Sequence, residues 1–318
     1  MSNKKSAVVL LNMGGPNNLE EVEVFLKNMF ADKNILTMKS GLLRSFVGGM
    51  IVFNRTESSQ EIYRQLGGKS PIVGHTQNLV AKLQKKLGEN VIVDFVMRYT
   101  PPFATEVIEK LSQENVDKIY LIPLYPQYST TTTKSSLEDF EEAYHNNDGD
   151  ALLVETKHFF ENKTYNKAII QNIKEKMADS DYIDFDIIFS AHGLPQKIVD
   201  SGDVYERHVK RHVEILKEMM QDEEMKFHDV HLAYQSKVGP MKWLEPSLED
   251  KLKSVRNKGV IIFPIAFTID NSETDFELEI EYREIAEEYG FKDYRVCRCP
   301  NDSELFVDAL AEIYEKMR

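Results

Sequence analysis

The chain has 318 residues, of which 42% are hydrophobic and 10% aromatic, enough for one large or two ordinary domains with their own cores. Its formal charge is -13, and no run of lysine and arginine is dense enough to follow a phosphate backbone, so nucleic acid is excluded as an expected partner. Cys297 and Cys299 are separated by one residue, a spacing poorly suited to a disulfide between them. We therefore expect a protein of the reducing cytoplasm.

The first apolar run lies in the opening segment "MSNKKSAVVLLNMGGP" and ends at a Gly-Gly-Pro turn without a small-residue cleavage site. We interpret it as a first strand and not as a signal peptide. The next apolar stretch, "GLLRSFVGGMIVF" at residues 41–53, is too short to span a bilayer and contains Arg44. Two interpretations of this stretch stay open: a helix that faces the core, or a hydrophobic rim that also touches a membrane surface.

Short runs rich in Val, Ile, Leu and Phe recur along the chain and predict strands at residues 7–13, 91–98, 118–126, 151–155, 185–190, 230–236, 259–267 and 294–299. Such continuous apolar strands are typical of a parallel sheet that is covered on both faces. Helical patterns with Ser or Thr at the start and acids in the first turn lie between them. This alternation predicts an α/β fold.

An internal similarity divides the chain into two halves. "AVVLLNMGGP" resembles "DIIFSAHGLP", and the strands that follow each of them answer one another in the same order. We interpret this as two similar βα units in tandem, in which a ligand is expected beyond the carboxyl ends of the strands. The first half is longer by an insertion that contains residues 41–53, which we expect to form a lip at the mouth of the ligand crevice.

Four glutamates follow the apolar run "GVIIFPIAFTI", within "SETDFELEIEY". On a helix, Glu273, Glu277 and Glu281 form one line beside a buried stripe, whereas Glu279 is expected on a solvated face. The alternation in "FELEIEY" leaves a strand as the other interpretation. Like charges in a half-buried line raise one another's pKa, so these carboxylates can pass protons near neutral pH, and they attract divalent cations.

His192 follows a predicted apolar strand and precedes a Gly, so its ring is expected to project into the same crevice. A lone histidine in such a place is more often structural, and only its context argues for function. The motifs "SAHGLP", "YQSKVGPMKWLEP" and "SETDFELEIEY", preceded by "LLNMGGP", "GGKSPI", "RYTPP" and "LYPQYSTTTT", resemble those of the ferrochelatases. The resemblance covers essentially the whole chain, and it implies a lyase that inserts ferrous iron into a porphyrin in haem synthesis.

The resemblance also implies an architecture: two tandem Rossmann-like domains of chelatase type, each with a doubly wound, mainly parallel four-stranded sheet, and an active-site cleft between them. We expect the first domain at residues 1–155, with a hydrophobic lip around 36–54 and with the C-terminal helix 300–318 joined to it. The second domain is expected at residues 156–299 and carries the histidine and the acidic helix.

Site residues follow from the same resemblance. His192 and Glu273 match the two principal metal and proton sites, which face each other across the macrocycle. Glu277 and Glu281 match further metal-binding acids that lead between this site and the surface. The porphyrin-binding wall is implied at four positions: Met13, Arg98, Tyr99 and Trp243. Methionine at position 13 is the residue that tends to occur in the branch that uses protoporphyrin IX.

The substrates implied are protoporphyrin IX and Fe²⁺, with no prosthetic group. Asn271 occupies a position where animal relatives have a histidine, so a role for that histidine does not transfer. Some relatives bind an iron–sulfur cluster through four ligands, but Cys297 and Cys299 are only two, so we predict no cluster. We expect a cytoplasmic enzyme, with peripheral membrane contact through residues 41–53 as an open possibility.

Two segments and the function of the chain have competing interpretations. "GGKSP" at residues 67–71 superficially matches a phosphate loop, but Tyr63 occupies the place of its required first glycine. The run "STTTTKSSLEDF" is either a helix cap or a polar loop at the ring's edge. A cobalt or nickel chelatase and a haem or metal carrier are the competing functions. The sequence does not tell whether His192 or Glu273 takes the pyrrole protons.

Overall fold

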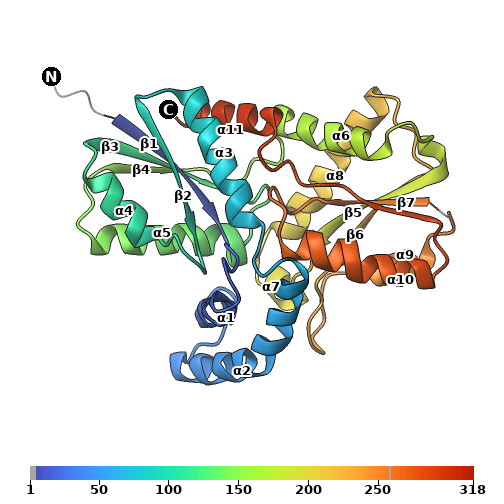
Figure 1. The fold of residues 1–318 in the computed structure, drawn as a ribbon, viewed down its shortest axis with the longest axis horizontal. Coiled ribbons are helices and arrows are strands. Elements are labelled where there is room, and N and C mark those ends of the chain that lie inside the picture. The colour runs from blue at the N-terminus through green and yellow to red at the C-terminus, as the bar shows by residue number, and fades with distance from the viewer. Residues whose placement is uncertain (1–4, 258) are drawn as a thin grey trace. The chain divides into compact units, whose positions relative to one another are not determined.

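The computed structural model describes residues 5–257 and 259–318. The chain forms two compact units, and Figure 1 shows the elements of each. Unit 1 comprises residues 1–158 and 310–318, and unit 2 comprises residues 159–309. The divisions expected from the sequence, after residues 155 and 299, fall earlier in the chain than these.

Unit 1 is built on a parallel four-stranded sheet in the order β2-β1-β3-β4. Its strands are β1 (Lys5–Asn12), β2 (Val91–Met97), β3 (Val116–Pro123) and β4 (Leu152–Glu155). β1 is the inner strand between β2 and β3, and it is buried from Ala7 to its end because both faces of the sheet are covered. In the register, Leu10 lies opposite Phe95 of β2 and Ile122 of β3.

The helices of unit 1 are α1 (Glu21–Ala31), α2 (Gly41–Gln65), α3 (Ile72–Leu87), α4 (Ala104–Ser112) and α5 (Ser135–Asn146), with a π-helical turn at Thr130–Lys134. α4 and α5 cover one face of the sheet, where Ile108 and Phe140 pack against Val9. α3 packs beside β2 and buries Leu79 and Leu83 completely. Helices thus cover both faces of the sheet, and this explains why β1 and β2 are mostly apolar without alternation.

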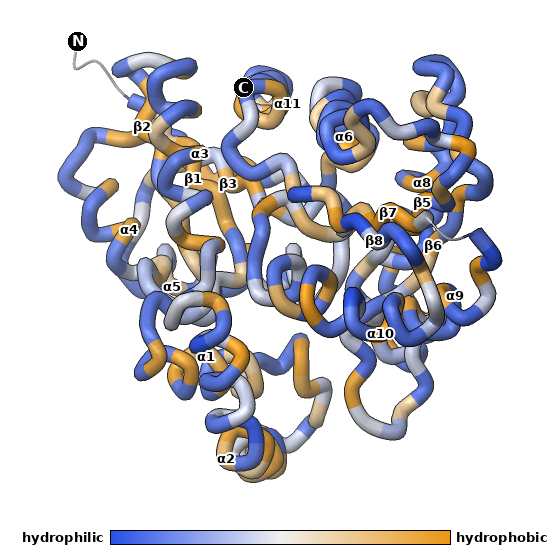
Figure 2. Tube along the Cα trace, turned by 45° about the vertical axis from the view of Figure 1, so that its right-hand side comes forward, coloured by the Kyte–Doolittle hydropathy of each residue, from blue (hydrophilic) through white to orange (hydrophobic). Residues whose placement is uncertain are grey.

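α2 carries the apolar stretch 41–53 on its first half, and hydrophobic residues are visible along it in Figure 2. Only one side of the helix is covered: Val52 and Tyr63 pack with α1 in a small core, and Gly48 allows close approach because a Cβ there would lie 3.0 Å from the carbonyl oxygen of Phe30. The exposed large side chains on its other side are Leu42, Leu43, Phe46, Met50 and Phe53. The interpretation as a helix that faces the core is therefore wrong for these five side chains.

Unit 2 repeats the order of unit 1 with the parallel sheet β6-β5-β7-β8. Its strands are β5 (Phe185–His192), β6 (Asp229–Gln235), β7 (Gly259–Pro264) and β8 (Asp293–Val296). Its helices are α6 (Lys163–Met177), α7 (Gln196–Asp200), α8 (Tyr205–Asp222), α9 (Leu248–Ser254) and α10 (Tyr282–Glu288), with a short 3₁₀ turn at Tyr182–Asp184 and a π-helix at Glu273–Glu281. The helix α11 (Glu304–Met317) closes the chain and contributes residues to both units.

The structure confirms the α/β class and the two tandem Rossmann-like domains, and each of the eight predicted strands is present. Strands β3 and β7 end earlier than predicted, at Pro123 and Pro264, although Leu124 and Ile265 still donate backbone hydrogen bonds to Leu11 and Ser190. The segment "FELEIEY" is helical, so the strand interpretation is wrong. Its hydrogen bonding is that of a π-helix and not of the α-helix assumed from the spacing.

Candidate active site

The candidate site of unit 2 lies at the point where the winding of its sheet reverses. β5 has β6 on one side and β7 on the other, so the connections leave this inner strand in opposite directions. Ligands of such sheets bind outside the carboxyl ends of the two strands at this point. His192 is the last residue of β5, and the π-helix Glu273–Glu281 follows the end of β7. The sheet thus places the imidazole and the acids at one edge, as the sequence indicated.

His192 and Glu273 form the centre of this site. The Nε2 atom of His192 lies 3.5 Å from Oε1 of Glu273. The other ring nitrogen, Nδ1, lies 2.6 Å from the carbonyl oxygen of Gly193, and because a carbonyl can only accept, Nδ1 carries a proton. Tyr205 donates a hydrogen bond to the backbone carbonyl of His192 at 2.9 Å, which fixes the strand end. Nε2 is therefore the ring nitrogen that faces the Glu273 carboxylate.

Glu273 begins the π-helix, and its backbone N–H donates to the side-chain oxygen of Asn271 at 2.8 Å. Its second carboxylate oxygen, Oε2, is buried and has no hydrogen-bond partner within the part of the chain that the structure describes. A buried acceptor without a donor costs about 1–3 kcal/mol, and such groups in native structures call for a reason. A proton or a metal cation delivered to this oxygen would supply the missing partner.

Glu277 lies one turn further along the π-helix and is held by three donors. The backbone N–H of Ser236 donates to Oε1 at 2.8 Å, and the Ser236 hydroxyl donates to Oε2 at 2.6 Å. The amide of Gln235 donates to Oε2 at 3.1 Å. Burial and the neighbouring Glu273 carboxylate raise the pKa of Glu277 to about 6. The second carboxylate of the line is thus close to its titration point at neutral pH.

The pKa of His192 is shifted by its neighbours in two directions. Burial lowers it, but the carboxylates of Glu273 and Glu277 and the hydrogen bond to Glu273 outweigh this effect and raise the pKa of His192 to about 9. The imidazole of His192 is therefore protonated at neutral pH in the unliganded protein.

The two remaining acids of the π-helix differ in their surroundings. Glu281 is exposed, and burial of part of the side chain, followed by Glu284, raises its pKa. The line Glu273, Glu277, Glu281 therefore runs from a partly buried to an exposed position. Glu279 forms an ion pair with Arg283, so its charge is already compensated. The sequence predicts a solvated face for Glu279, and its side chain is 42% exposed.

Trp243 lies close to the end of β5 in unit 2. A Cβ placed on Gly193 would lie 3.2 Å from Cε3 of Trp243 and 2.9 Å from the carbonyl oxygen of Gln235, so only glycine leaves room for the indole beside His192. Pro195 and Trp243 form a backbone bridge, and the indole N–H donates to the carbonyl of Val238 at 3.0 Å.

The other three wall residues lie together at the carboxyl edge of the sheet of unit 1. Tyr99 donates its backbone N–H to the carbonyl of Met13 at 3.0 Å, and the two side chains pack in the same cluster. The Tyr99 side chain is only 3% exposed, and its hydroxyl donates to Asp32 at 2.8 Å. Burial and the nearby Asp32 carboxylate raise the pKa of Tyr99 well above its ordinary value.

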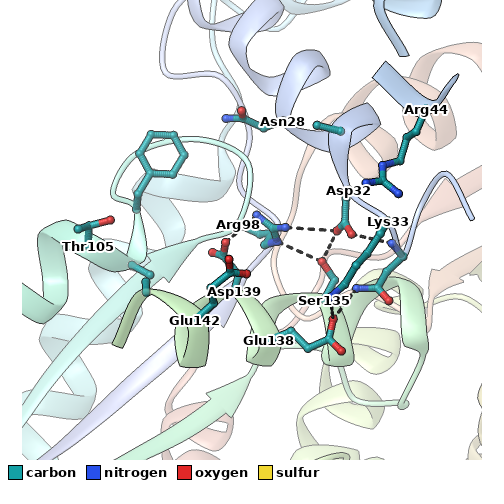
Figure 3. Close-up of a pocket in the computed structure, with 15 residues that line it drawn as sticks. Asn28, Asp32, Lys33, Arg44, Arg98, Thr105, Ser135, Glu138, Asp139 and Glu142 are labelled. Carbon is teal, nitrogen blue, oxygen red and sulfur yellow. Dashed lines mark hydrogen bonds and ion pairs between the residues drawn. The ribbon is translucent and has the colours of Figure 1, made fainter. Parts of the chain in front are cut away.

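Arg98 lines a polar cavity of about 450 Å³ in unit 1, shown in Figure 3. Its guanidinium lies 2.9 Å from Asp139 and 3.6 Å from Asp32, and its Nε donates to the hydroxyl of Ser135 at 3.1 Å. The Ser135 hydroxyl also donates to Asp32. Asp32 is thus a buried carboxylate shared by Arg98, Tyr99 and Ser135, a set that the sequence did not reveal.

The polar run "STTTTKSSLEDF" begins with Ser129, which caps the π-helical turn Thr130–Lys134. Ser129 accepts a hydrogen bond from the N–H of Thr131 at 3.2 Å, and the π-helical turn begins there. Of the two interpretations of this run, the helix cap is confirmed by this bond.

The possible metal ligands and the two cysteine thiols lie in unit 2. Within residues 5–257 and 259–318, no group of three or more His, Cys, Asp or Glu side chains is arranged to hold a metal ion, so His192 and Glu273 offer one nitrogen and one carboxylate. Cys297 and Cys299 are buried free thiols whose pKa is raised by burial. None of the helices described is long and apolar enough to cross a membrane.

The fold is that of a chelatase. The sirohydrochlorin chelatase SirB from Bacillus subtilis subspecies spizizenii, in complex with cobalt, has a similar fold with a TM-score of 0.58 and 11% sequence identity, covering 98% of this chain and 95% of that one.

Sequence comparison then identifies the family. The Ferrochelatase family model matches residues 5–318. A ferrochelatase of Sulfurimonas denitrificans is 69% identical over 99% of this chain and 100% of its own length, and one of Nitratiruptor sp. is 53% identical over 98% and 99%. The chain belongs to the ferrochelatase family.

Proposed function

We propose that His192 and Glu273 transfer metal and protons in the reaction of this chain. That reaction follows from the family: a ferrochelatase is a lyase that inserts Fe²⁺ into protoporphyrin IX in haem biosynthesis, forming protohaem and releasing two protons. The observation that carries the proposal is the buried, unpartnered Oε2 of Glu273, whose other oxygen is 3.5 Å from Nε2 of His192.

Metallation exchanges two pyrrole N–H protons for one divalent cation. The site must therefore accept protons and guide a metal. The protonated imidazole of His192 can accept a pyrrole proton only after it has lost the proton on Nε2. In the unliganded pair the Glu273 carboxylate keeps the pKa of His192 at about 9. A cation that approaches Glu273 offsets this negative charge, which favours release of the imidazole proton and leaves Nε2 as a base. Arrival of the metal thus prepares the histidine for proton removal.

The acids beyond Glu273 supply a route to solvent in this proposal. Glu277 is partly buried, with a pKa of about 6, and Glu281 is exposed. Carboxylates with these properties exchange protons and divalent cations stepwise, because none binds them irreversibly. Glu279 is left out of the route because Arg283 compensates its charge.

The porphyrin contacts are proposed from local surroundings in each unit. Trp243 lies against Gly193, next to His192, where its indole can cover a flat ring. Met13 packs with Tyr99, so Tyr99 supports this wall from within, whereas Arg98 keeps 21% of its side chain exposed for a porphyrin carboxylate. Methionine at position 13 supports protoporphyrin IX as the ring.

Peripheral membrane contact is proposed for the exposed side of α2. Leu42 and Phe53 are 88% and 86% exposed, and they belong to a row of five large apolar side chains. A surface of this kind in a helix that cannot span a bilayer fits interfacial binding. The cytoplasmic location stays a prediction.

The test of the function is an anaerobic assay in which purified protein, protoporphyrin IX and Fe²⁺ are mixed and the absorption change of the porphyrin is followed. Turnover is expected for the wild type and its loss for His192→Ala and for Glu273→Gln. Parallel assays with Co²⁺ and Ni²⁺ and with other tetrapyrroles identify the preferred pair. Stoichiometric binding without turnover would indicate a carrier, and full activity of His192→Ala would remove the assigned role of His192.

A further inference from the structure

Ser236 has an unusual backbone conformation for a residue with a side chain. It is the first residue after β6, and its φ of +63° lies in the left-handed region. This region costs a residue other than glycine roughly 1–2 kcal/mol. The conformation directs both the N–H and the hydroxyl of Ser236 to the Glu277 carboxylate, at 2.8 and 2.6 Å. Two hydrogen bonds to a charged acceptor offset the cost of the turn.

Gln235 approaches the same carboxylate from the end of the strand. It is 1% exposed, and its amide nitrogen donates to Oε2 of Glu277 at 3.1 Å. The orientation of the amide is fixed because its oxygen accepts from the fully buried Ser190 hydroxyl at 2.7 Å. Ser190 lies in β5, two residues before His192. We name Ser236 and Gln235 the Glu277 clamp, since together they occupy both oxygens of that carboxylate.

The clamp consists of uncharged donors, and this distinguishes Glu277 from its neighbours. An ion pair with arginine compensates the charge of Glu279 on the same stretch of chain. An amide, a hydroxyl and a peptide N–H fix the position of a carboxylate and leave its net negative charge in place. Glu273, in contrast, keeps one buried oxygen without any donor in the described structure. One carboxylate is therefore held while the other is available to react.

We propose that Ser236 and Gln235 are positioning residues for the metal substrate: they hold Glu277 at a fixed place beside Glu273 so that a divalent cation is handed from one carboxylate to the next. The inference rests on the proposed function of this site. It predicts that the clamp governs how the enzyme uses iron and has little influence on how it binds the porphyrin, since no clamp residue belongs to the proposed porphyrin wall.

The first experiment compares steady-state kinetics of Ser236→Gly with the wild type, varying Fe²⁺ and protoporphyrin IX separately. Glycine keeps the N–H and accepts the positive φ, so the variant removes only the hydroxyl bond. We expect KM for Fe²⁺ to rise about tenfold, as loss of one hydrogen bond to a charged group suggests. KM for protoporphyrin IX should change less than about twofold. Gln235→Leu, which removes the amide donor at similar volume, should show the same separation.

A second pair of variants tests the hydroxyl itself. Ser236→Thr and Ser236→Val have the same branched shape and the same strain at positive φ, and they differ in one hydroxyl. We expect the KM of Ser236→Thr for Fe²⁺ to be close to that of the wild type, and the KM of Ser236→Val to be higher. Ser247→Gly serves as the control, because Ser247 in the same unit also donates its hydroxyl to a carboxylate, that of Asp250, as the cap of α9. This control should leave both KM values unchanged.

The outcomes separate the two proposals. If the wild type inserts no iron, the proposed function fails, whatever the variants do. If the wild type is active and Ser236→Gly and Gln235→Leu keep its KM for Fe²⁺, the clamp has no role and the inference is overturned. Equal increases in both KM values, with a lowered unfolding midpoint, would show a purely structural role and would also overturn it. A selective rise for iron in folded variants supports it.

Discussion

The imidazole of His192 and the carboxylate of Glu273 face each other at 3.5 Å, and the backbone carbonyl next to the histidine fixes which nitrogen takes part. The two residues are far apart in sequence, but β5 and β7 are neighbouring strands, and both side chains leave the same edge of the sheet. The carboxylate of Glu273 stabilises the protonated form of His192, and this raises the pKa of the imidazole. Its protonation therefore reports directly on the contact.

The first prediction concerns stability as a function of pH. The folded-state pKa of His192 is about 9, above its ordinary 6.5, because Glu273 outweighs the opposing effect of burial. The folded state then binds this proton more tightly than the unfolded state, so the contribution to stability is complete below pH 6.5 and is lost as the pH rises through 9. His192→Ala should flatten the fall in the free energy of unfolding over this window.

Urea unfolding measured at several pH values tests this dependence in unit 2. Trp243 is the single tryptophan of the chain and lies in this unit, so its fluorescence reports the relevant transition. Glu277→Gln is the companion variant. The pKa of Glu277 is raised from 4.5 to about 6, so its contribution to stability is complete below pH 4.5 and is lost as the pH rises through 6. A His192→Ala protein that keeps the wild-type slope between pH 6.5 and 9 would contradict the assignment.

The second prediction concerns Gly193, the glycine that follows His192. Gly193→Ala would bring a Cβ to 2.9 Å from the backbone oxygen of Gln235 and 3.2 Å from the Trp243 ring. Such overpacking costs about 1–3 kcal/mol, and it displaces the strand end that carries His192. We expect a lower unfolding midpoint in urea together with reduced iron insertion. Gly74→Ala in α3, where nothing lies within 4 Å of the new Cβ, should be neutral or stabilising by about 0.5–1 kcal/mol.

Much of this organisation was predictable from the sequence because the relevant signals are local. The inner strands β1 and β5 are largely apolar runs, and His192 ends the run of β5. The line of Glu273, Glu277 and Glu281 was visible because residues four apart share one side of any helix. The family motifs then assigned roles to these positions.

Other features depend on contacts between distant segments and leave no local signal. The left-handed turn at Ser236 could not be predicted, since serine is common in ordinary loops and only the Glu277 carboxylate explains its conformation. Asp32 looks like a solvent-exposed residue in "FADKN", yet it is 4% exposed and binds Tyr99 and Ser135. The strand ends at Pro123 and Pro264 were missed because apolar residues continue beyond them.

The third prediction concerns that buried aspartate. Asp32→Ala would leave the Tyr99 and Ser135 hydroxyls and the Arg98 guanidinium without a shared acceptor. Removing one partner from a buried charged network costs about 3–5 kcal/mol. Asp139→Ala breaks only the ion pair between Arg98 and Asp139, whose side chains are 21% and 29% exposed respectively. This variant should cost less than about 1 kcal/mol. Thermal unfolding followed by circular dichroism compares the two variants, and similar midpoints would argue against a buried network.

The fourth prediction concerns the exposed side of α2. Flotation with phosphatidylcholine and phosphatidylserine vesicles should recover the wild-type protein with lipid. A double variant, Leu42→Ser with Phe53→Ser, should bind at least about a hundredfold more weakly, because each large apolar side chain that enters the bilayer contributes about 2 kcal/mol. Ile183→Ser removes a side chain of unit 2 that is also 60% exposed and should bind like the wild type. Equal flotation of all three proteins would remove the membrane role of α2.

The last prediction compares two glutamates of the same π-helix. Glu277→Gln and Glu279→Gln change the net charge equally, so any general electrostatic effect on iron is matched. In the first variant one amide N–H₂ group must face the donors of Ser236 and Gln235, and the charge beside Glu273 is lost. In the second, only the ion pair with Arg283 is broken, and such half-exposed pairs contribute about 0–1 kcal/mol.

We therefore expect kcat/KM for Fe²⁺ to fall about tenfold to a hundredfold in Glu277→Gln and to stay within about twofold of the wild type in Glu279→Gln. The measurement is the anaerobic insertion assay with varied Fe²⁺ at saturating porphyrin. Equal losses in the two variants would mean that iron responds to the overall charge of the helix, and the ordered line from Glu281 to Glu273 would then have no mechanistic meaning. A loss confined to Glu277→Gln would show that the position of the removed charge matters, because both variants remove one negative charge from the same π-helix.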